Sequence, residues 1–124
     1  SLLEESDIVS IHCPLNPQSD GLFSDETFAS MKEGAFLINT ARGPIVDEQA
    51  LANALQSGKL CGAALDVLET EPMSEDCPLL GAPNCIITPH MAWAPIETRK
   101  RLLGVVAENI RGFLNSSPRN VVNP

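Results

Sequence analysis

The chain has 124 residues and a formal net charge of −8, from 16 acidic and 8 basic side chains. Hydrophobic residues make up 44% of the sequence and charged residues 19%, which is typical of one globular domain. The acidic balance argues against nucleic acid or an anionic membrane surface as a partner, and no apolar run approaches the roughly 20 residues that span a bilayer.

In chain order, the residues predict strands that alternate with helices. Pro14 ends the first, β-branched strand, which is typical of the strands that parallel sheets bury. Ser24 is a suitable N-cap for the first helix, and Asp47 begins the second, whose apolar residues form one stripe. Strands are expected at 7–13, 35–39, 61–67 and 85–87, and helices at 25–31, 47–56 and 96–114. This alternation predicts an α/β fold with a parallel, Rossmann-like sheet and a long C-terminal helix.

The cysteines and the first residues bear on the compartment of the protein. The four cysteines form no CxxC motif, and neither histidine lies at ligand spacing from a cysteine pair. We therefore expect buried free thiols, no metal site and a reducing compartment, the cytoplasm. The sequence opens with residues typical of the end of a helix, without an initiating methionine or a signal peptide, so we expect a fragment of a longer protein.

Three chemically useful side chains, Arg42, Glu71 and His90, each follow a predicted strand. Because the carboxyl ends of parallel strands meet at one edge of a sheet, we expect these groups to converge. Arg42 offers a planar fork for a carboxylate, and His90 can transfer a proton near neutral pH. Glu71 can hold the other imidazole nitrogen. Such a set suits the interconversion of a 2-oxo and a 2-hydroxy acid, with a nicotinamide supplying the hydride.

Each of these side chains also has an ordinary structural explanation. Arg42 could cap the preceding turn or pair with Asp47, and Glu71 could be one of several solvated acids. His90 could be a capping or surface histidine, and Asp66 could be a turn residue at a strand end. The occurrence of three such groups at three successive strand ends favours the functional interpretation.

Four segments resemble, in order and spacing, the motifs of the D-isomer-specific 2-hydroxyacid dehydrogenases. They are His12–Leu15, Asn39–Leu51, Gly62–Pro72 and Asn84–His90, and the resemblance covers nearly the whole chain. It implies that Arg42 binds the substrate, that His90 is the catalytic acid/base, and that Glu71 is its acidic partner. It also implies NAD or NADP as cofactor, a small 2-oxo or 2-hydroxy acid as substrate, and a homodimer.

The same resemblance implies further binding residues. The cofactor would contact Cys13, Pro14, Thr40, Ala41, Arg42, Asp66, His90 and Ala92. The substrate would contact Arg42, His90 and Trp93. The Ala92-Trp93 pair is similar to that of the glycerate dehydrogenase/hydroxypyruvate reductase members of the family. Trp93 could wall the substrate pocket, even from a neighbouring subunit, or serve as a core or interface anchor.

The family's Gly-rich phosphate loop has no counterpart here, because these residues contain no G-x-G-x-x-G. The resemblance therefore places residues 1–95 in the nicotinamide half of an NAD-binding domain and 96–124 in a C-terminal helix and tail. We predict that this polypeptide alone binds NAD(H) weakly and has no measurable turnover. The alternatives are an NAD-sensing, non-catalytic module similar to the C-terminal-binding-protein corepressors, and an inactive fragment.

Overall fold

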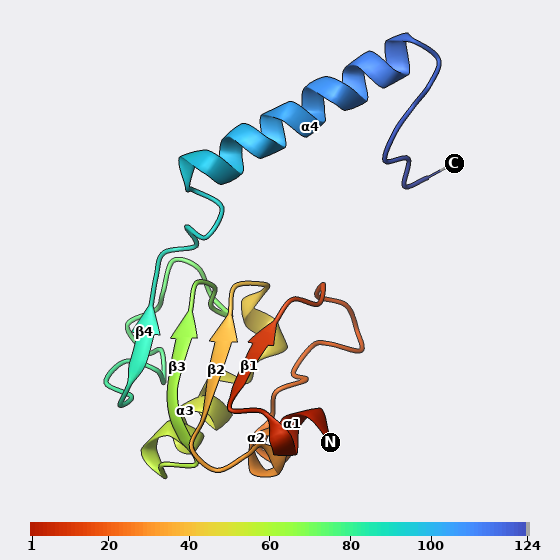
Figure 1. Cartoon of the computed structure of the whole chain (residues 1–124). Coiled ribbons are helices and arrows are strands. Elements are labelled where there is room, and N and C mark those ends of the chain that lie inside the picture. The colour runs from red at the N-terminus through yellow and green to blue at the C-terminus, as the bar shows by residue number, and fades with distance from the viewer. Residues whose placement is uncertain (124) are drawn as a thin grey trace. The chain divides into compact units, whose positions relative to one another are not determined.

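The computed structural model describes residues 1–123 and contains one parallel sheet with accompanying helices (Figure 1). The strands are β1 (Ile8–Ile11), β2 (Ala35–Asn39), β3 (Leu60–Leu65) and β4 (Cys85–Ile87). The α-helices are α1 (Leu2–Glu5), α2 (Asp25–Ser30), α3 (Glu48–Gln56) and α4 (Ile96–Leu114), and η1 (Gly43–Ile45) is a 3₁₀ turn. The predicted α/β class and the order of its elements are confirmed. β1 is shorter than expected, because β2 ends at the register partner of Ile11.

The four strands pair in the order β1-β2-β3-β4, and every neighbouring pair is parallel. The register matches Ile11 with Asn39, Asn39 with Leu65, and Leu65 with Ile87. These four residues are also the last of their strands, so all four strands end at the same level. The loops that follow them therefore share one edge of the sheet, which is where open α/β folds carry their chemistry.

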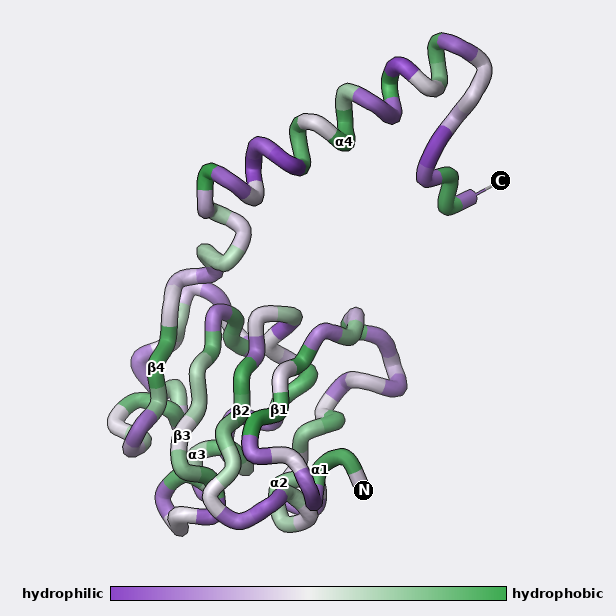
Figure 2. Tube along the Cα trace, viewed as in Figure 1, coloured by the Kyte–Doolittle hydropathy of each residue, from purple (hydrophilic) through white to green (hydrophobic). Residues whose placement is uncertain are grey.

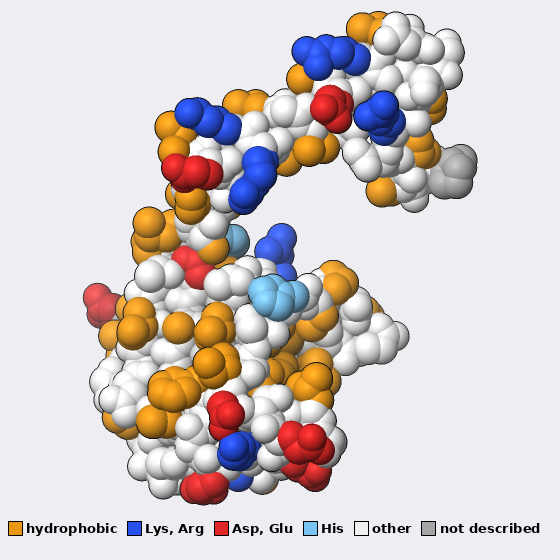
Figure 3. Space-filling model, viewed as in Figure 1, with side chains coloured by type: hydrophobic (Ala, Val, Ile, Leu, Met, Phe, Trp, Pro, Cys, Tyr) orange, Lys and Arg blue, Asp and Glu red, His pale blue; other side chains and the backbone are white. Residues whose placement is uncertain are grey.

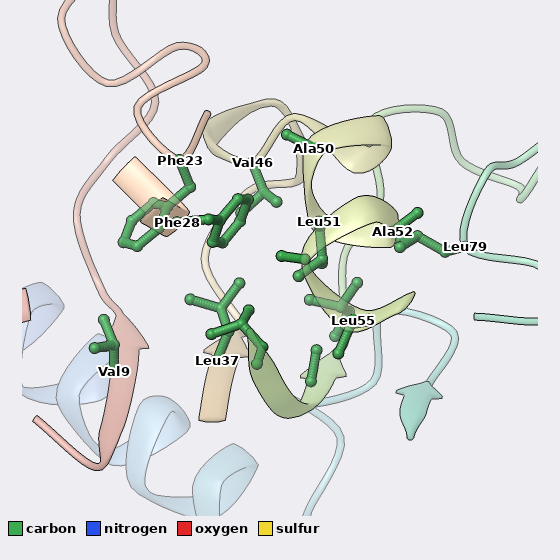
Figure 4. Packing of buried hydrophobic residues seen from close by; sticks show 14 of the residues in the cluster. Val9, Phe23, Phe28, Leu37, Val46, Ala50, Leu51, Ala52, Leu55 and Leu79 are labelled. Atoms are coloured by element: carbon green, nitrogen blue, oxygen red, sulfur yellow. The ribbon is translucent and has the colours of Figure 1, made fainter. Parts of the chain in front are cut away.

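The hydrophobic core lies between one face of the sheet and the helices α2 and α3 (Figure 4). Leu37 of β2 and Leu51 of α3 are fully buried. The rings of Phe23 and Phe28 pack at 6.0 Å between centroids, with a tilt of 45°. Burial of each such side chain contributes about 1.5–3 kcal/mol. The sequence predicted that Asp47 begins this helix; in the structure it is the N-cap of α3, and its side chain accepts a hydrogen bond from the Ala50 backbone N–H at 2.9 Å.

The opposite face of the sheet is exposed, so the expectation that β1 belongs to the fully buried type of strand is wrong. β1 alternates exposed and buried residues, and large apolar side chains stand on three strands at Ile8, Phe36 and Ile86, which are 60%, 45% and 66% exposed. Figure 3 shows hydrophobic side chains gathered over the strands. The reason is that α2 and α3 cover a single face. Cys61 of β3 is likewise exposed, contrary to the expectation of buried thiols, whereas Cys77 is buried.

Within the described part of the chain, residues 91–123 form a second compact unit, distinct from Ser1–His90. Its main element, α4, buries none of its residues, although apolar and polar residues alternate along it (Figure 2). Its predicted apolar side is exposed throughout: Leu102, Leu103, Val106, Ile110 and Phe113. Across residues 1–123, no helix has both the length and the apolar character needed to cross a bilayer.

Candidate active site

The ends of β3 and β4 are joined by a side-chain hydrogen bond. Asp66 directly follows β3 and is only 5% exposed, while Thr88 directly follows β4. The Thr88 hydroxyl donates to the Asp66 carboxylate, and the Thr88 backbone N–H donates to the Leu65 carbonyl oxygen at 2.9 Å. These bonds fix the start of the segment that carries His90.

His90 and Glu71 are brought together as the sequence predicted. His90 Nδ1 lies 2.7 Å from Glu71 Oε2, and the Leu68 backbone N–H donates to Glu71 Oε1 at 3.0 Å. The bond to His90 and then the bond from Leu68 hold the pKa of the Glu71 carboxyl below its usual range, against the opposing effects of desolvation and, less strongly, of the Asp66 charge. The side chains are 45% and 37% exposed, so a ligand in solution can reach them.

The backbone at His90 is held in a conformation that non-glycine residues rarely adopt. Its φ is +52°, in the left-handed region, and its N–H donates to the Thr88 carbonyl oxygen at 3.0 Å. Such positions persist where the surrounding structure determines them, and they are common at functional sites. This turn directs the chain out of β4 and places the imidazole beside Glu71.

A concavity of about 560 Å³ lies over this pair. It is lined by Asp66, Leu68, Glu71, Pro72, Met73, Ile87, Thr88, Pro89 and His90. Its wall is mainly apolar, with the Asp66 carboxylate at the end of β3 and the Glu71 carboxylate and His90 imidazole in the loops after β3 and β4. Such a pocket with a few convergent polar groups has the character of a small-molecule site.

Arg42 lies in a second concavity, at the ends of β1 and β2. The lining residues are His12, Cys13, Pro14, Leu15, Thr40, Ala41 and Arg42. Arg42 is exposed, and its Nη1 donates to the Ala41 carbonyl oxygen at 2.6 Å. The ion pair with Asp47 that the sequence left open is not formed within residues 1–123, because the Asp47 carboxylate caps α3 instead.

The structure therefore divides the predicted site residues into three groups. Glu71, His90 and Asp66 share the first concavity, and Cys13, Pro14, Thr40, Ala41 and Arg42 share the second. Ala92 and Trp93 belong to the separate unit that begins at Met91. There, Trp93 is 61% exposed and Arg99 lies 5.9 Å from its ring centroid, a cation–π distance. Trp93 is therefore not a core residue of the described chain.

Some residues that shape these loops do not stand out in the sequence. Asn39 is 1% exposed: its Oδ1 accepts from the Ala41 N–H, and its Nδ2 donates to the Arg42 carbonyl oxygen, both at 2.9 Å. It therefore folds the loop that presents Arg42. The signal was an asparagine closing an otherwise apolar strand, since a buried amide needs partners. Thr88 and Glu48 were also missed, and neither had a distinctive local pattern.

Comparisons with known proteins relate this chain to one family. Residues 1–92 match the family described as D-isomer specific 2-hydroxyacid dehydrogenase, NAD binding domain. The chain is 52% identical over 122 residues to a hydroxypyruvate reductase of Blautia hydrogenotrophica, covering 98% of this chain and 38% of that protein. It is 47% identical over 124 residues to a glyoxylate reductase of Thermofilum pendens, covering 99% of this chain and 37% of that protein.

Solved structures of related proteins share the fold of this chain. An acyclic imino acid reductase in complex with NADPH and D-Arg has a TM-score of 0.85 at 37% identity, over 98% of this chain and 39% of that one. A D-isomer specific 2-hydroxyacid dehydrogenase from Xanthobacter autotrophicus, in complex with NADPH and MES, has a TM-score of 0.81 at 41% identity, over 95% and 48%. The chain spans less than half the length of each of these relatives. With the family match extending over residues 1–92, this chain belongs to the NAD-binding-domain family of the D-isomer-specific 2-hydroxyacid dehydrogenases.

Proposed function

We propose that this chain supplies the acid/base pair and the nicotinamide-facing surface of an oxidoreductase that interconverts a 2-oxo acid and a D-2-hydroxy acid. The observation that carries the proposal is the 2.7 Å contact between His90 Nδ1 and Glu71 Oε2, at the carboxyl edge of a parallel sheet. Relatives named hydroxypyruvate reductase and glyoxylate reductase support small 2-oxo acids of that kind as substrates.

His90 is the proposed proton donor for reduction and acceptor for oxidation. Because the Glu71 carboxylate can only accept, the bond between them places a proton on His90 Nδ1 and makes Nε2 the nitrogen that exchanges a proton with the substrate oxygen. Glu71 also stabilises the positive charge of the imidazolium. A positioned acid/base of this type contributes about 10²- to 10⁴-fold to a rate.

Arg42 is the proposed anchor for the substrate carboxylate. Its guanidinium is exposed, and it donates a hydrogen bond to the Ala41 carbonyl oxygen of its own loop. A planar fork that is always charged can exchange that bond for a bidentate contact with a carboxylate. The same fork can polarise the adjacent 2-oxo group.

The residues at this edge fit a nicotinamide cofactor, NAD or NADP. The two concavities combine apolar surface with hydrogen-bonding groups, including the buried Asp66 carboxylate, an acceptor at the end of β3. The proposed cofactor contacts are Cys13, Pro14, Thr40, Ala41, Arg42, Asp66, His90 and Ala92. When bound, the nicotinamide supplies a hydride to C2 of the 2-oxo acid.

A chimeric enzyme tests the proposal. In it, this chain replaces the aligned segment of the Blautia hydrogenotrophica hydroxypyruvate reductase, to which it is 52% identical. We expect the chimera to oxidise NADH with hydroxypyruvate or glyoxylate. The unaltered relative is the control for the assay, and circular dichroism and NADH binding report folding. A chimera that folds and binds NADH but reduces no 2-oxo acid would refute the proposal.

We also propose that the active protein is a cytoplasmic homodimer. Four free cysteines among the described residues support a reducing compartment. The exposed apolar side chains of the sheet and of α4 support self-association. Sedimentation equilibrium of the chimeric enzyme, which is the active form, should give a particle of twice its chain mass. A single-chain mass at all concentrations would contradict the dimer.

A further inference from the structure

One buried acid, Glu48, has no part in the proposed chemistry. It is the first residue of α3 and is 9% exposed, which is unusual because a buried carboxylate is costly unless it is hydrogen-bonded. An acid in the first turn of a helix is favourable on a solvent-exposed face, where it complements the helix dipole. The inward orientation of Glu48 therefore needs a further reason.

Both carboxylate oxygens of Glu48 are bonded to the loop that carries Glu71. Oε1 accepts from the Glu69 backbone N–H at 2.7 Å, and Oε2 lies 3.5 Å from Cys77 Sγ. Burial raises the pKa of the Cys77 thiol, and the nearby Glu48 charge raises it further. The thiol therefore remains protonated and can donate a hydrogen bond. Glu48 thus joins α3 to two points of the loop, on either side of Glu71.

The bonds continue from Glu48 to the proposed acid/base. Glu69 is held by Glu48, and the preceding residue, Leu68, donates its N–H to Glu71 Oε1 at 3.0 Å. The second oxygen of Glu71 then meets His90 Nδ1 at 2.7 Å. The adjacent N–H groups of Leu68 and Glu69 therefore bond two different carboxylates. The Glu69 N–H bonds Glu48, which holds the loop, and the Leu68 N–H bonds Glu71, which holds the imidazole of His90.

We propose that Glu48 is a positioning residue, which fixes the 68–77 loop so that the Glu71 carboxylate meets His90. The effect of Glu48 on catalysis rests on the proposed function, whereas its role in placing the Glu71 carboxylate does not. Glu48 acts through the Glu69 backbone N–H and the Cys77 side chain, and its described bonds include neither Glu71 nor His90.

The test compares Glu48→Met with Glu48→Gln in the full 124-residue chain. Methionine keeps the length of the side chain and removes the oxygen acceptor, whereas glutamine keeps an oxygen for the Glu69 N–H. The readout is the NMR titration of the Glu71 carboxyl carbon, assigned with Glu71→Gln. His90 and Asp66 are the titratable groups that act on it.

We expect the Glu71 pKa to rise toward its usual range in Glu48→Met, with a change in the His90 ring shifts, and both to stay as in the parent in Glu48→Gln. Unchanged Glu71 and His90 signals in a folded Glu48→Met chain would overturn the proposal. If Glu48→Met does not fold, Glu48→Asp decides, because its carboxylate is withdrawn by about 1.5 Å, one carbon–carbon bond. The proposal then requires the same rise in Glu48→Asp, and its absence refutes it.

The titration needs neither cofactor nor substrate, so its result is independent of the proposed function. In the chimeric enzyme, Glu48→Met should lower kcat more than it raises KM, and Glu48→Gln should restore kcat. If the Glu71 pKa does not rise in Glu48→Met but the chimera is active, only the positioning role of Glu48 is refuted. If the Glu71 pKa rises in Glu48→Met but the chimera is inactive, only the proposed function is refuted.

Discussion

At the scale of single residues, the contact between Glu71 and His90 is the main support for the proposed acid/base chemistry. Both side chains are more than one-third exposed, so solvent screens their attraction and their contribution to stability is small. Their value is geometric, because the carboxylate selects one imidazole tautomer and one ring orientation.

The pH dependence of stability should reveal this bond. The pKa of Glu71 is depressed in the folded chain, so its stabilisation is present above the unfolded-state pKa and is lost as pH falls through the folded-state pKa. We expect the stability difference between the parent and Glu71→Gln in urea unfolding to shrink as pH falls below about 4.3, the usual glutamate value. Glu69→Gln is the matched control. A difference that does not vary with pH would argue against the bond.

Arg42→Lys in the chimeric enzyme should raise the KM for the 2-oxo acid. Lysine keeps the positive charge but loses the bidentate fork, and a hydrogen bond to a charged group is worth roughly 1.5–3 kcal/mol. The expected rise is therefore roughly ten- to a hundredfold. The KM for NADH in the same assay controls for a general loss of binding. Equal KM values for the 2-oxo acid in both enzymes would remove Arg42 from the substrate site.

At the scale of elements, the loops after β2 and β3 are in direct contact. A Cβ built on Gly43 would lie 1.8 Å from the Leu68 carbonyl oxygen, so only glycine allows this approach. Leu68 is also the residue whose N–H supports Glu71. The loop that presents Arg42 and the loop that presents Glu71 are therefore fitted to each other through Gly43.

Gly43→Ala should consequently destabilise the chain. The added methyl meets backbone rather than a flexible side chain, and overpacking of this kind costs about 1–3 kcal/mol or more. Gly104→Ala is the control: it lies in α4 with open space around the new methyl, and should raise helicity and stabilise by about 0.5–1 kcal/mol. Urea unfolding and circular dichroism measure both. A Gly43→Ala chain as stable as the parent would show that the two loops adjust freely.

Much of the fold could be predicted from the sequence, because it depends on local patterns. Pro14, the apolar runs and the helix cap at Asp47 act over a few residues, and parallel pairing then places the groups that follow the strands at one edge. Asn39, Glu48 and Gly43 could not be assigned their roles in this way. Their partners depend on loop conformation or on residues more than twenty positions away. The exposed sheet face was also missed, since apolar strands look alike whether or not both faces are covered.

At the scale of the whole molecule, the sequence contains the proposed nicotinamide-facing residues but no Gly-rich phosphate loop. Backbone N–H groups of such a loop bind the pyrophosphate, so most of the cofactor's charge has no anchor in these 124 residues. The formal charge of −8 further disfavours a dinucleotide.

The isolated polypeptide should therefore bind NADH weakly, with Kd on the order of millimolar, which corresponds to about −4 kcal/mol. Fluorescence titration of NADH measures this, and the chimeric enzyme serves as the positive control. We also expect no measurable turnover of hydroxypyruvate by the isolated polypeptide. Micromolar affinity would contradict this view of the cofactor site.

The most direct test of the central claim is kcat of the chimeric enzyme after His90→Asn, with Glu69→Gln as control. If His90 transfers the proton, kcat for hydroxypyruvate falls about 10²- to 10⁴-fold in His90→Asn, while NADH binding and the Glu69→Gln enzyme stay near the parent values. A His90→Asn enzyme that folds, binds NADH and keeps its parent kcat would contradict the account.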